Sequence, residues 1–214
     1  MSVRRSTATV RLGAACGVVG PTAFITGWVV AGATTPGYSA RQAISELARL
    51  GAPHRVLMTL AFLVFGVAML AFARALPPAL GGSAVLSGAL TLSGLAVLGV
   101  AAFPLDPRHA GIENTLHGSF AVAGYVGTAL APLAGGWRWH RSGHPTIAVV
   151  SAAVGLASAV ALAATSWSSG PGRWQRAGLT LADGWFIAMA LWVLLVQAPR
   201  SQCTTSAISP LSTS

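Results

Sequence analysis

The stretch 56-VLMTLAFLVFGVAMLAFARA-75 decides the fold class of this chain. No charged residue occurs between Arg55 and Arg74, so the apolar run is unbroken. A helix of roughly 20 apolar residues crosses a bilayer core about 30 Å thick, and this stretch therefore predicts a transmembrane helix. Five other stretches share this character, and the six predicted spans lie near 12–34, 56–75, 81–103, 115–135, 145–166 and 178–197.

The composition supports a membrane protein over the whole length. The chain is 54% hydrophobic and 8% charged, with a mean hydropathy of +0.68, whereas about a quarter of the residues in soluble domains are charged. We predict an all-α polytopic bundle of six transmembrane helices. It divides into a cytoplasmic N-terminus (1–11), one membrane domain (12–197) and a disordered, Ser/Thr-rich cytoplasmic tail (198–214).

The basic charge indicates membrane anchoring and not nucleic-acid binding. The net charge of +9 comes from thirteen arginines and no lysine, scattered among short loops and helix ends. Such side chains extend to lipid headgroups. Arg4, Arg5 and Arg11 precede the first span, and the positive-inside rule places both termini in the cytoplasm of a plasma-membrane protein. Membrane lipid is the expected partner, and the oligomeric state stays open.

The loop after the first span predicts a short amphipathic helix at about 40–50. Ser39 and Gln42 fit an S-x-x-Q capping box. Ile44, Leu47 and Ala48 follow at helical spacing, and Gly51 is a suitable C-terminal stop. We expect this helix to lie on the membrane surface, with its apolar stripe either covering the bundle or entering the headgroup layer. Glu46 and Arg49 are three residues apart and can pair.

The acidic residues are the main functional lead, because a carboxylate close to hydrocarbon is energetically costly. All four are predicted on one side of the membrane: Glu46, Asp106, Glu113 and Asp183. Together with nearby histidines they suggest a pocket on the outer side. The candidate catalytic residues are Glu46, Asp106, His117 and Asp183, and the candidate substrate-binding residues are Tyr38, Ser39, His54, His109, Glu113 and Trp185.

The start of the fourth span carries the densest part of this group. Asp106 before Pro107 predicts a helix N-cap, which would place His109, Glu113 and His117 on one helix face. Three interpretations stay open: a structural role with the histidines wet at the interface, a metal site of imidazole and carboxylate, or acid–base chemistry and ligand capture. We predict no cofactor and no bound metal.

Asp183 stands in an apolar helix and needs a partner or a cavity. One interpretation pairs it with Arg173 or Arg176, one or two turns earlier. The other leaves it as a neutral acid lining an apolar pocket, with space opened by Gly184. Either way, we expect no bare buried carboxylate.

Several short motifs carry a resemblance to a known family. The segments Pro36-Gly-Tyr-Ser39, Ala43-Ile-Ser-Glu-Leu47, Gly51-Ala-Pro-His54 and Phe103-Pro-Leu-Asp106, followed by His117, resemble the bacterial membrane family called domain of unknown function 998. The resemblance covers about residues 12–197. It implies six helices, a relation to Frag1/DRAM/Sfk1-like membrane proteins and no settled activity. The positions that match the family pattern are Tyr38, Ser39, Ser45, Glu46, Pro104, Asp106 and His117.

Two classes of function follow from the sequence. The first is a non-catalytic protein that binds a lipid or an apolar ligand through the outer pocket. The alternative is a small membrane-integral enzyme on an apolar substrate, such as a terpene cyclase that uses a protonated carboxylate as acid. The second rests on analogy, because no motif matches residue by residue.

Overall fold

The computed structural model describes residues 7–108 and 111–197, and their regular structure is helical. The elements in chain order are α1 (Thr7–Thr34), the 3₁₀-helix η1 (Ile44–Ala48), α2 (Arg55–Ala79), α3 (Ala84–Ala102), α4 (Ile112–Arg141), α5 (Pro145–Ala164), α6 (Pro171–Trp192) and the π-helix η2 (Val193–Gln197). The predicted tail and His109 lie outside the described residues.

Six of the described helices are long and apolar enough to cross a membrane, which confirms the predicted fold class. Several run past the apolar stretches that predicted them. α6, for example, begins at Pro171 and not near 178, so its first two turns contain Arg173 and Arg176. A helix does not have to end where the hydrocarbon ends, because arginine is a good helix former and reaches the headgroup layer from a helical backbone.

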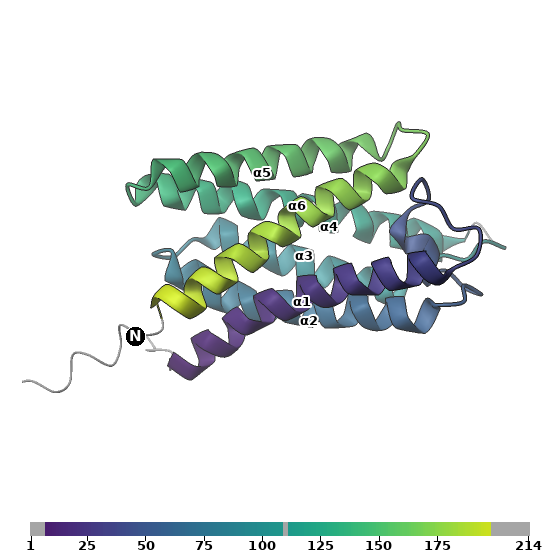
Figure 1. Ribbon diagram of the computed structural model, residues 1–214, viewed down its shortest axis with the longest axis horizontal. Helices are drawn as coiled ribbons and strands as arrows, with labels where there is room; N and C mark the ends of the chain where they lie inside the picture. Colours follow the sequence, from purple (N-terminus) through teal and green to yellow (C-terminus); the bar gives the residue numbers. More distant parts are fainter. Residues whose placement is uncertain (1–6, 109–110, 198–214) are drawn as a thin grey trace, which may run out of the picture.

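The helices form a closed bundle in which each packs against the next, and α6 returns to α1 (Figure 1). α6 runs obliquely, starting beside α5 and ending beside α1. We call the end that carries the α1–α2, α3–α4 and α5–α6 loops the η1 end. The opposite end, where α1 begins and α6 finishes, is the terminal end.

Small residues set the distance between α1 and α2. A Cβ built on Gly13 would lie 2.9 Å from the Ala75 Cβ, and one built on Gly17 would lie 2.7 Å from the Phe72 ring. Such contacts are possible only without a side chain, so these glycines let the two helices approach closely.

The segment between α1 and α2 differs from the predicted surface helix. Helical structure is confined to the five residues of η1, and Ile44, Leu47 and Ala48 are buried. Ser39 N–H does donate to Gln42 Oε1 at 2.8 Å, which is half of a capping box, but the chain does not continue as an α-helix from there. The predicted apolar stripe is present. Its side chains pack into the end of the bundle and are buried by protein contacts there.

Candidate functional site

A cavity lies inside the bundle directly behind η1. Its empty volume is about 540 Å³ including its opening, and the part that can hold the centre of a water molecule is about 50 Å³. The lining comes from α1, η1, α2, α3, α4 and α6: Phe24, Ile44, Ser45, Phe62, Phe65, Val97, Val100, His117, Phe120, Ala121, Gly124, Tyr125, Thr128, Gln175 and Leu179. We call this space the inner cavity.

The inner cavity is mainly apolar and aromatic, with a few polar groups. Ser45, His117, Tyr125, Thr128 and Gln175 carry the polar atoms, while phenylalanines from three helices and aliphatic side chains form the rest of the wall. Thr128 shares a hydrogen bond of 2.9 Å with Ser93. This combination of apolar wall and few polar groups is typical of small-molecule sites.

The segment 38–50, which we call the plug, closes the cavity at the η1 end. Ile44 and Ser45 form part of the cavity wall, and Ile44 is 1% exposed. The plug is also tied to the α3–α4 loop, since Leu50 N–H donates to Leu105 O at 2.8 Å. A ligand entering from this end would have to pass or displace the plug.

Gln175 links the plug to the wall of the cavity. Its side-chain oxygen accepts from Ile44 N–H at 2.7 Å, and its amide nitrogen donates to the Tyr125 hydroxyl at 2.7 Å. The residue is buried. Because it satisfies a backbone donor of the plug on one side and a cavity hydroxyl on the other, it couples the position of η1 to the shape of the cavity.

Arg176 holds the outer part of the plug. Its guanidinium donates to Ala40 O at 2.8 Å, to Gln42 O at 3.1 Å and to the Tyr38 hydroxyl. It also lies over the rings of Trp28 and Tyr38, at 5.3 and 5.4 Å from their centroids. These are charge-assisted hydrogen bonds and cation–π contacts, so a single side chain of α6 fixes this loop.

Tyr38 completes this anchor. Its hydroxyl donates to Ala43 O at 3.0 Å. Burial raises the pKa of the Tyr38 phenol, the Arg176 guanidinium opposes that rise, and Glu46 adds slightly to it. The phenol is therefore neutral at physiological pH and acts as a structural donor.

His117 is the buried histidine of the site. It is 4% exposed, and its Nδ1 lies 2.7 Å from Phe103 O. A carbonyl can only accept, so this bond assigns the proton of the neutral ring to Nδ1 and leaves Nε2 as an acceptor. Within the described part of the chain no hydrogen-bond partner of Nε2 is seen, and the residue lines the inner cavity.

Glu46 lies on the other side of the plug from the cavity. It forms an ion pair with Arg49 at 3.5 Å, as predicted, and both side chains are about two-fifths exposed, at 39% and 42%. It lines a shallow outer hollow together with Tyr38 and Gln42. It does not line the inner cavity, although its neighbour Ser45 does.

Asp106 does not cap α4, so the predicted N-cap is wrong: the helix begins at Ile112, and its N-cap position is Gly111. The Asp106 carboxylate instead accepts from Arg108 N–H at 2.8 Å. The Asn114 side chain bridges the Asp106 backbone, with bonds of 2.8 and 2.9 Å. An Asx turn competes well with helix initiation for an aspartate, and here it shapes the loop.

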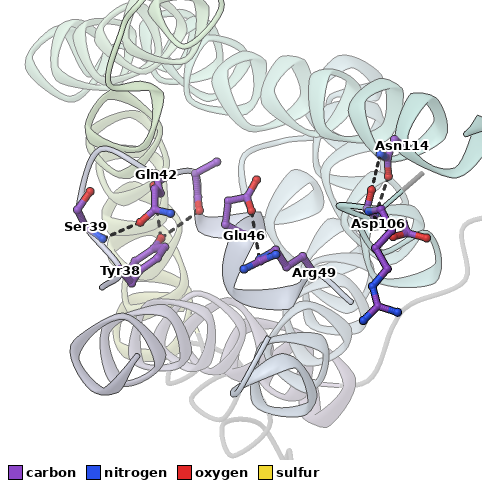
Figure 2. Close-up of polar contacts among 9 residues, drawn as sticks. Tyr38, Ser39, Gln42, Glu46, Arg49, Asp106 and Asn114 are labelled. Atoms are coloured by element: carbon purple, nitrogen blue, oxygen red, sulfur yellow. Dashed lines mark hydrogen bonds and ion pairs between the residues drawn. The ribbon is translucent and has the colours of Figure 1, made fainter. Parts of the chain in front are cut away.

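The polar residues of the η1 end therefore form separate clusters. Figure 2 shows Tyr38, Ser39 and Gln42 together, Glu46 with Arg49, and Asp106 with Asn114 at a distance from both. Glu46 and Asp106 each have a local partner of their own.

Three other candidates lie at the rim. Ser39 and Glu113 are exposed. His54 Nε2 is 2.9 Å from Thr34 Oγ1, a bond that joins the end of α1 to the start of α2. None of the three lines the inner cavity.

Asp183 lies apart from the loops, deep in the bundle. It follows Pro171 by twelve residues, which corresponds to about 18 Å along a helix. It is 1% exposed, and neither carboxyl oxygen has a hydrogen-bond partner among the described residues. The interpretation that pairs Asp183 with Arg173 or Arg176 is therefore wrong, and the Arg176 guanidinium is bound to the plug instead. Gly184 opens no cavity for it, since that glycine is exposed on the outside of the bundle.

Trp185 also serves packing and lies away from the inner cavity. Its indole N–H donates to Ser151 Oγ at 2.9 Å, and its ring lies where a Cβ on Gly135 would be. The tryptophan therefore joins α6 to α4 and α5.

Sequence reasoning missed Gln175, Tyr125 and the phenylalanines of the cavity. Gln175 fell outside the predicted sixth span, and the phenylalanines read as ordinary apolar residues. A usable signal was the polar pair Gln175-Arg176 next to an apolar stretch, because two such groups at a helix start need partners. Within residues 7–108 and 111–197, no three His, Cys, Asp or Glu side chains gather closely enough to hold a metal ion.

Comparison with known families decides the relationship. The family model described as "Protein of unknown function (DUF998)" matches residues 18–192. The chain belongs to this family. This DUF998 protein is a multi-pass helical membrane protein, and its family assignment brings no activity with it. Searches of curated proteins and of solved structures found no match.

Proposed function

We propose that this DUF998 protein binds an apolar small molecule or lipid chain in the inner cavity, with the plug as its closure. The observation that carries the proposal is the cavity itself, enclosed by aromatic side chains from three helices around a few polar groups. An apolar chain gains from this burial, and the hydrogen-bonding groups of Ser45, His117 and Tyr125 would orient a polar end.

Two neighbouring residues of α4 offer a matched test. Ala121 lines the cavity, whereas Val122 is 60% exposed on the outside of the bundle. Ala121→Trp should fill the space, and Val122→Trp should leave it open. Protein purified from its native membrane would be extracted, and co-purifying lipids and apolar metabolites quantified by mass spectrometry.

The wild type and Val122→Trp should retain the same compound in near-stoichiometric amount, and Ala121→Trp should lose it. Equal retention by all three proteins would contradict the proposal. The Ala121→Trp protein must first unfold at the same temperature as Val122→Trp, so that loss of ligand is not loss of fold.

An enzyme acting on an apolar substrate is the second candidate. One observation favours it: His117 reaches the cavity with an acceptor nitrogen that has no partner among the described residues. The carboxylates Glu46, Asp106 and Asp183 do not line the cavity. In this candidate function His117, and none of them, would therefore act as the acid or base. His117→Asn keeps an N–H for Phe103 O and removes Nε2. Turnover of prenylated or epoxidised isoprenoids that disappears in this variant would support catalysis.

We also propose a plasma-membrane location with both termini in the cytoplasm. The support is the cluster Arg4, Arg5 and Arg11 ahead of α1. A reporter that is active only in the cytoplasm, fused after Arg200, should give signal. Signal from a reporter active only outside the cytoplasm would reverse the orientation.

A further inference from the structure

A second hollow lies on the outside of the η1 end, where the plug meets the start of α6. It is lined by Arg41 of the plug, by Ser168 and Ser169 of the α5–α6 loop, and by Arg173 and Trp174 of α6. We call it the headgroup groove. It shares no lining residue with the inner cavity, so an inference about it is independent of the proposed function.

The groove presents two cations, Arg41 and Arg173, for which the described part of the chain shows no ion pair. Arg41 and Arg173 are exposed, and the hydrogen bond seen for the Arg41 guanidinium is a long one of 3.4 Å to Ser169 Oγ. No hydrogen bond or ion pair of the Arg173 side chain occurs in the described structure. None of the four acidic residues lines the groove, and Glu46 is already paired with Arg49.

The neighbouring donors show that the arginine side chains themselves form the site. The start of α6 is not free to bind an anion, because Gly172 N–H donates to Arg41 O at 2.9 Å and Arg173 N–H to Gly170 O at 3.2 Å. Arg176, one turn later, is held by the plug. Ser168 Oγ accepts from Gly170 N–H, which leaves its hydroxyl proton available to a ligand.

Two exposed indoles place the groove at the membrane surface. Trp174 lines it and is 46% exposed, and Trp167 in the adjoining loop is 74% exposed. Exposed tryptophans at the ends of spanning helices gather at the level of lipid headgroups. The two arginines therefore lie at the same depth as the headgroups of the surrounding lipids.

We propose that the headgroup groove binds the phosphate of an anionic membrane lipid, with Arg41 and Arg173 on the phosphate oxygens, the serine hydroxyls as additional donors and Trp174 beside the upper acyl chain. Guanidinium groups match phosphate oxygens in charge and in fork geometry. The site would also fix the plug, because one arginine belongs to the plug and the other to α6.

The test uses the full-length protein in a zwitterionic detergent, titrated with phosphatidylglycerol or phosphatidylcholine and followed by native mass spectrometry. Arg41→Gln/Arg173→Gln removes two charges from the groove. Arg55→Gln/Arg108→Gln removes two charges from exposed residues of the same η1 end but outside the groove, and serves as the matched control.

The groove variant should weaken phosphatidylglycerol binding by at least about tenfold, as expected for two arginines at a lipid surface, with little change for phosphatidylcholine. The control should change it by less than about threefold. Ser169→Asp, which adds a carboxylate to the groove without removing an arginine, should also weaken binding. It keeps the test decisive if the double variant is unstable.

Three results would overturn the proposal. The first is equal loss in the groove variant and its control, which would indicate diffuse electrostatic attraction. The second is unchanged binding in both the groove variant and Ser169→Asp. The third is displacement of phosphatidylglycerol by soluble glycerol phosphate at a similar concentration, which would assign the groove to a free phosphate compound and not to a lipid.

Discussion

The two ends of the bundle are built on different contacts. Toward the terminal end, glycines bring helices together: a Cβ on Gly136 would lie 2.9 Å from Ala148 O, and one on Gly13 would meet Ala75. At the η1 end, large rings stand between the helices, with Phe24 at 5.8 Å from Phe62 and 5.5 Å from Phe65 between ring centroids. Close glycine contacts also occur in the η1 half, where a Cβ on Gly27 would lie 2.8 Å from the Ala61 Cβ. The inner cavity, however, lies where the phenylalanine rings stand between the helices.

The polar side chains at the two ends also bind different kinds of backbone segment. Near the terminal end, Arg138 closes the α2–α3 turn by donating to Leu80 O and Gly81 O, at 3.0 and 3.1 Å. At the η1 end, Arg176 and Gln175 hold a segment that has little regular structure of its own. A helix satisfies its own backbone, but a loop within a membrane protein must be satisfied by side chains. The η1 end is therefore the part that local changes can open.

The strongest test of this contrast compares two glycines one turn apart on α4. A Cβ on Gly127 would lie 2.6 Å from Ser93 N and 2.8 Å from Ala89 O, which are backbone atoms of α3. A Cβ on Gly124, beside the cavity, would meet the Ala96 Cβ at 3.5 Å. We expect Gly127→Ala to destabilise by about 1–3 kcal/mol through overpacking. Gly124→Ala should stabilise by roughly 0.5–1 kcal/mol through backbone entropy.

The measurement is unfolding of both variants in mixed micelles at increasing denaturing detergent. The free energy of unfolding should fall for Gly127→Ala and rise for Gly124→Ala. Equal destabilisation by both substitutions would show that the η1 half is packed as tightly as the other half, and would contradict the cavity.

The next largest effect is expected at Arg176. Arg176→Gln removes the cation–π contacts and at least two of the hydrogen bonds that fix the plug, and we expect the local opening free energy to fall by roughly 1–2 kcal/mol. Hydrogen exchange of residues 38–50 should accelerate about 10-fold or more, while exchange at the terminal end stays unchanged. Arg141→Gln is the control, because Arg141 is exposed at the terminal end, where it lies over the Trp137 ring. Uniform acceleration along the chain would contradict a local role.

A smaller effect is expected from the titration of Tyr38. Since burial raises the pKa of its phenol in the folded state, the folded protein retains the proton at a pH where the unfolded chain loses it. The Tyr38 contribution to stability is therefore complete below about pH 10 and is lost as the pH rises through the folded pKa.

The chain has two tyrosines, so Tyr125→Phe leaves Tyr38 as the single phenol. Ultraviolet titration of that variant should give a midpoint above about 10, and Arg176→Gln should shift it further up, because a lowering charge is removed. A midpoint at or below the ordinary value would show that the plug is open to solvent.

The smallest effect is expected at Asp183, between the two ends. Asp183→Asn should change the free energy of unfolding by less than about 1 kcal/mol, because no ion pair is lost and the side chain keeps its size. Breaking a buried ion pair would cost roughly 3–5 kcal/mol. A loss of that size would reveal a cation partner for Asp183.

Much of the architecture could be predicted from the sequence because a bilayer leaves few alternatives. Apolar runs such as 56–75 can satisfy their backbone only as helices, so their number and approximate positions follow directly. The Glu46–Arg49 pair was also predictable, because both partners lie within one short segment. The predicted N-cap at Asp106 was wrong. The sequence around an aspartate is compatible with both an Asx turn and a helix start, and it does not decide between them.

The candidate site was predicted only in part. The sequence pointed to the end of the bundle where the inner cavity lies and included His117 of its lining, but it grouped four carboxylates that the fold keeps in separate places. Glu46 and Asp106 have local partners, and Asp183 is carried into the interior by its position on α6. The partners of Arg176 could not be predicted, because its contacts with Ala40 and Gln42 span 136 and 134 residues.

By itself, the sequence determined that this chain is a six-helix membrane protein of the DUF998 family, because hydrophobic length and short motifs are local properties. The tertiary structure alone decided that residues 44–48 close a cavity rather than cover a surface, and that His117 lines it. It also decided that Arg41 meets Arg173 in one groove. These outcomes depend on how obliquely α6 crosses α1 and on which distant side chains fill the gap. Both depend on packing across the whole bundle, so they cannot be deduced from any single segment of the sequence.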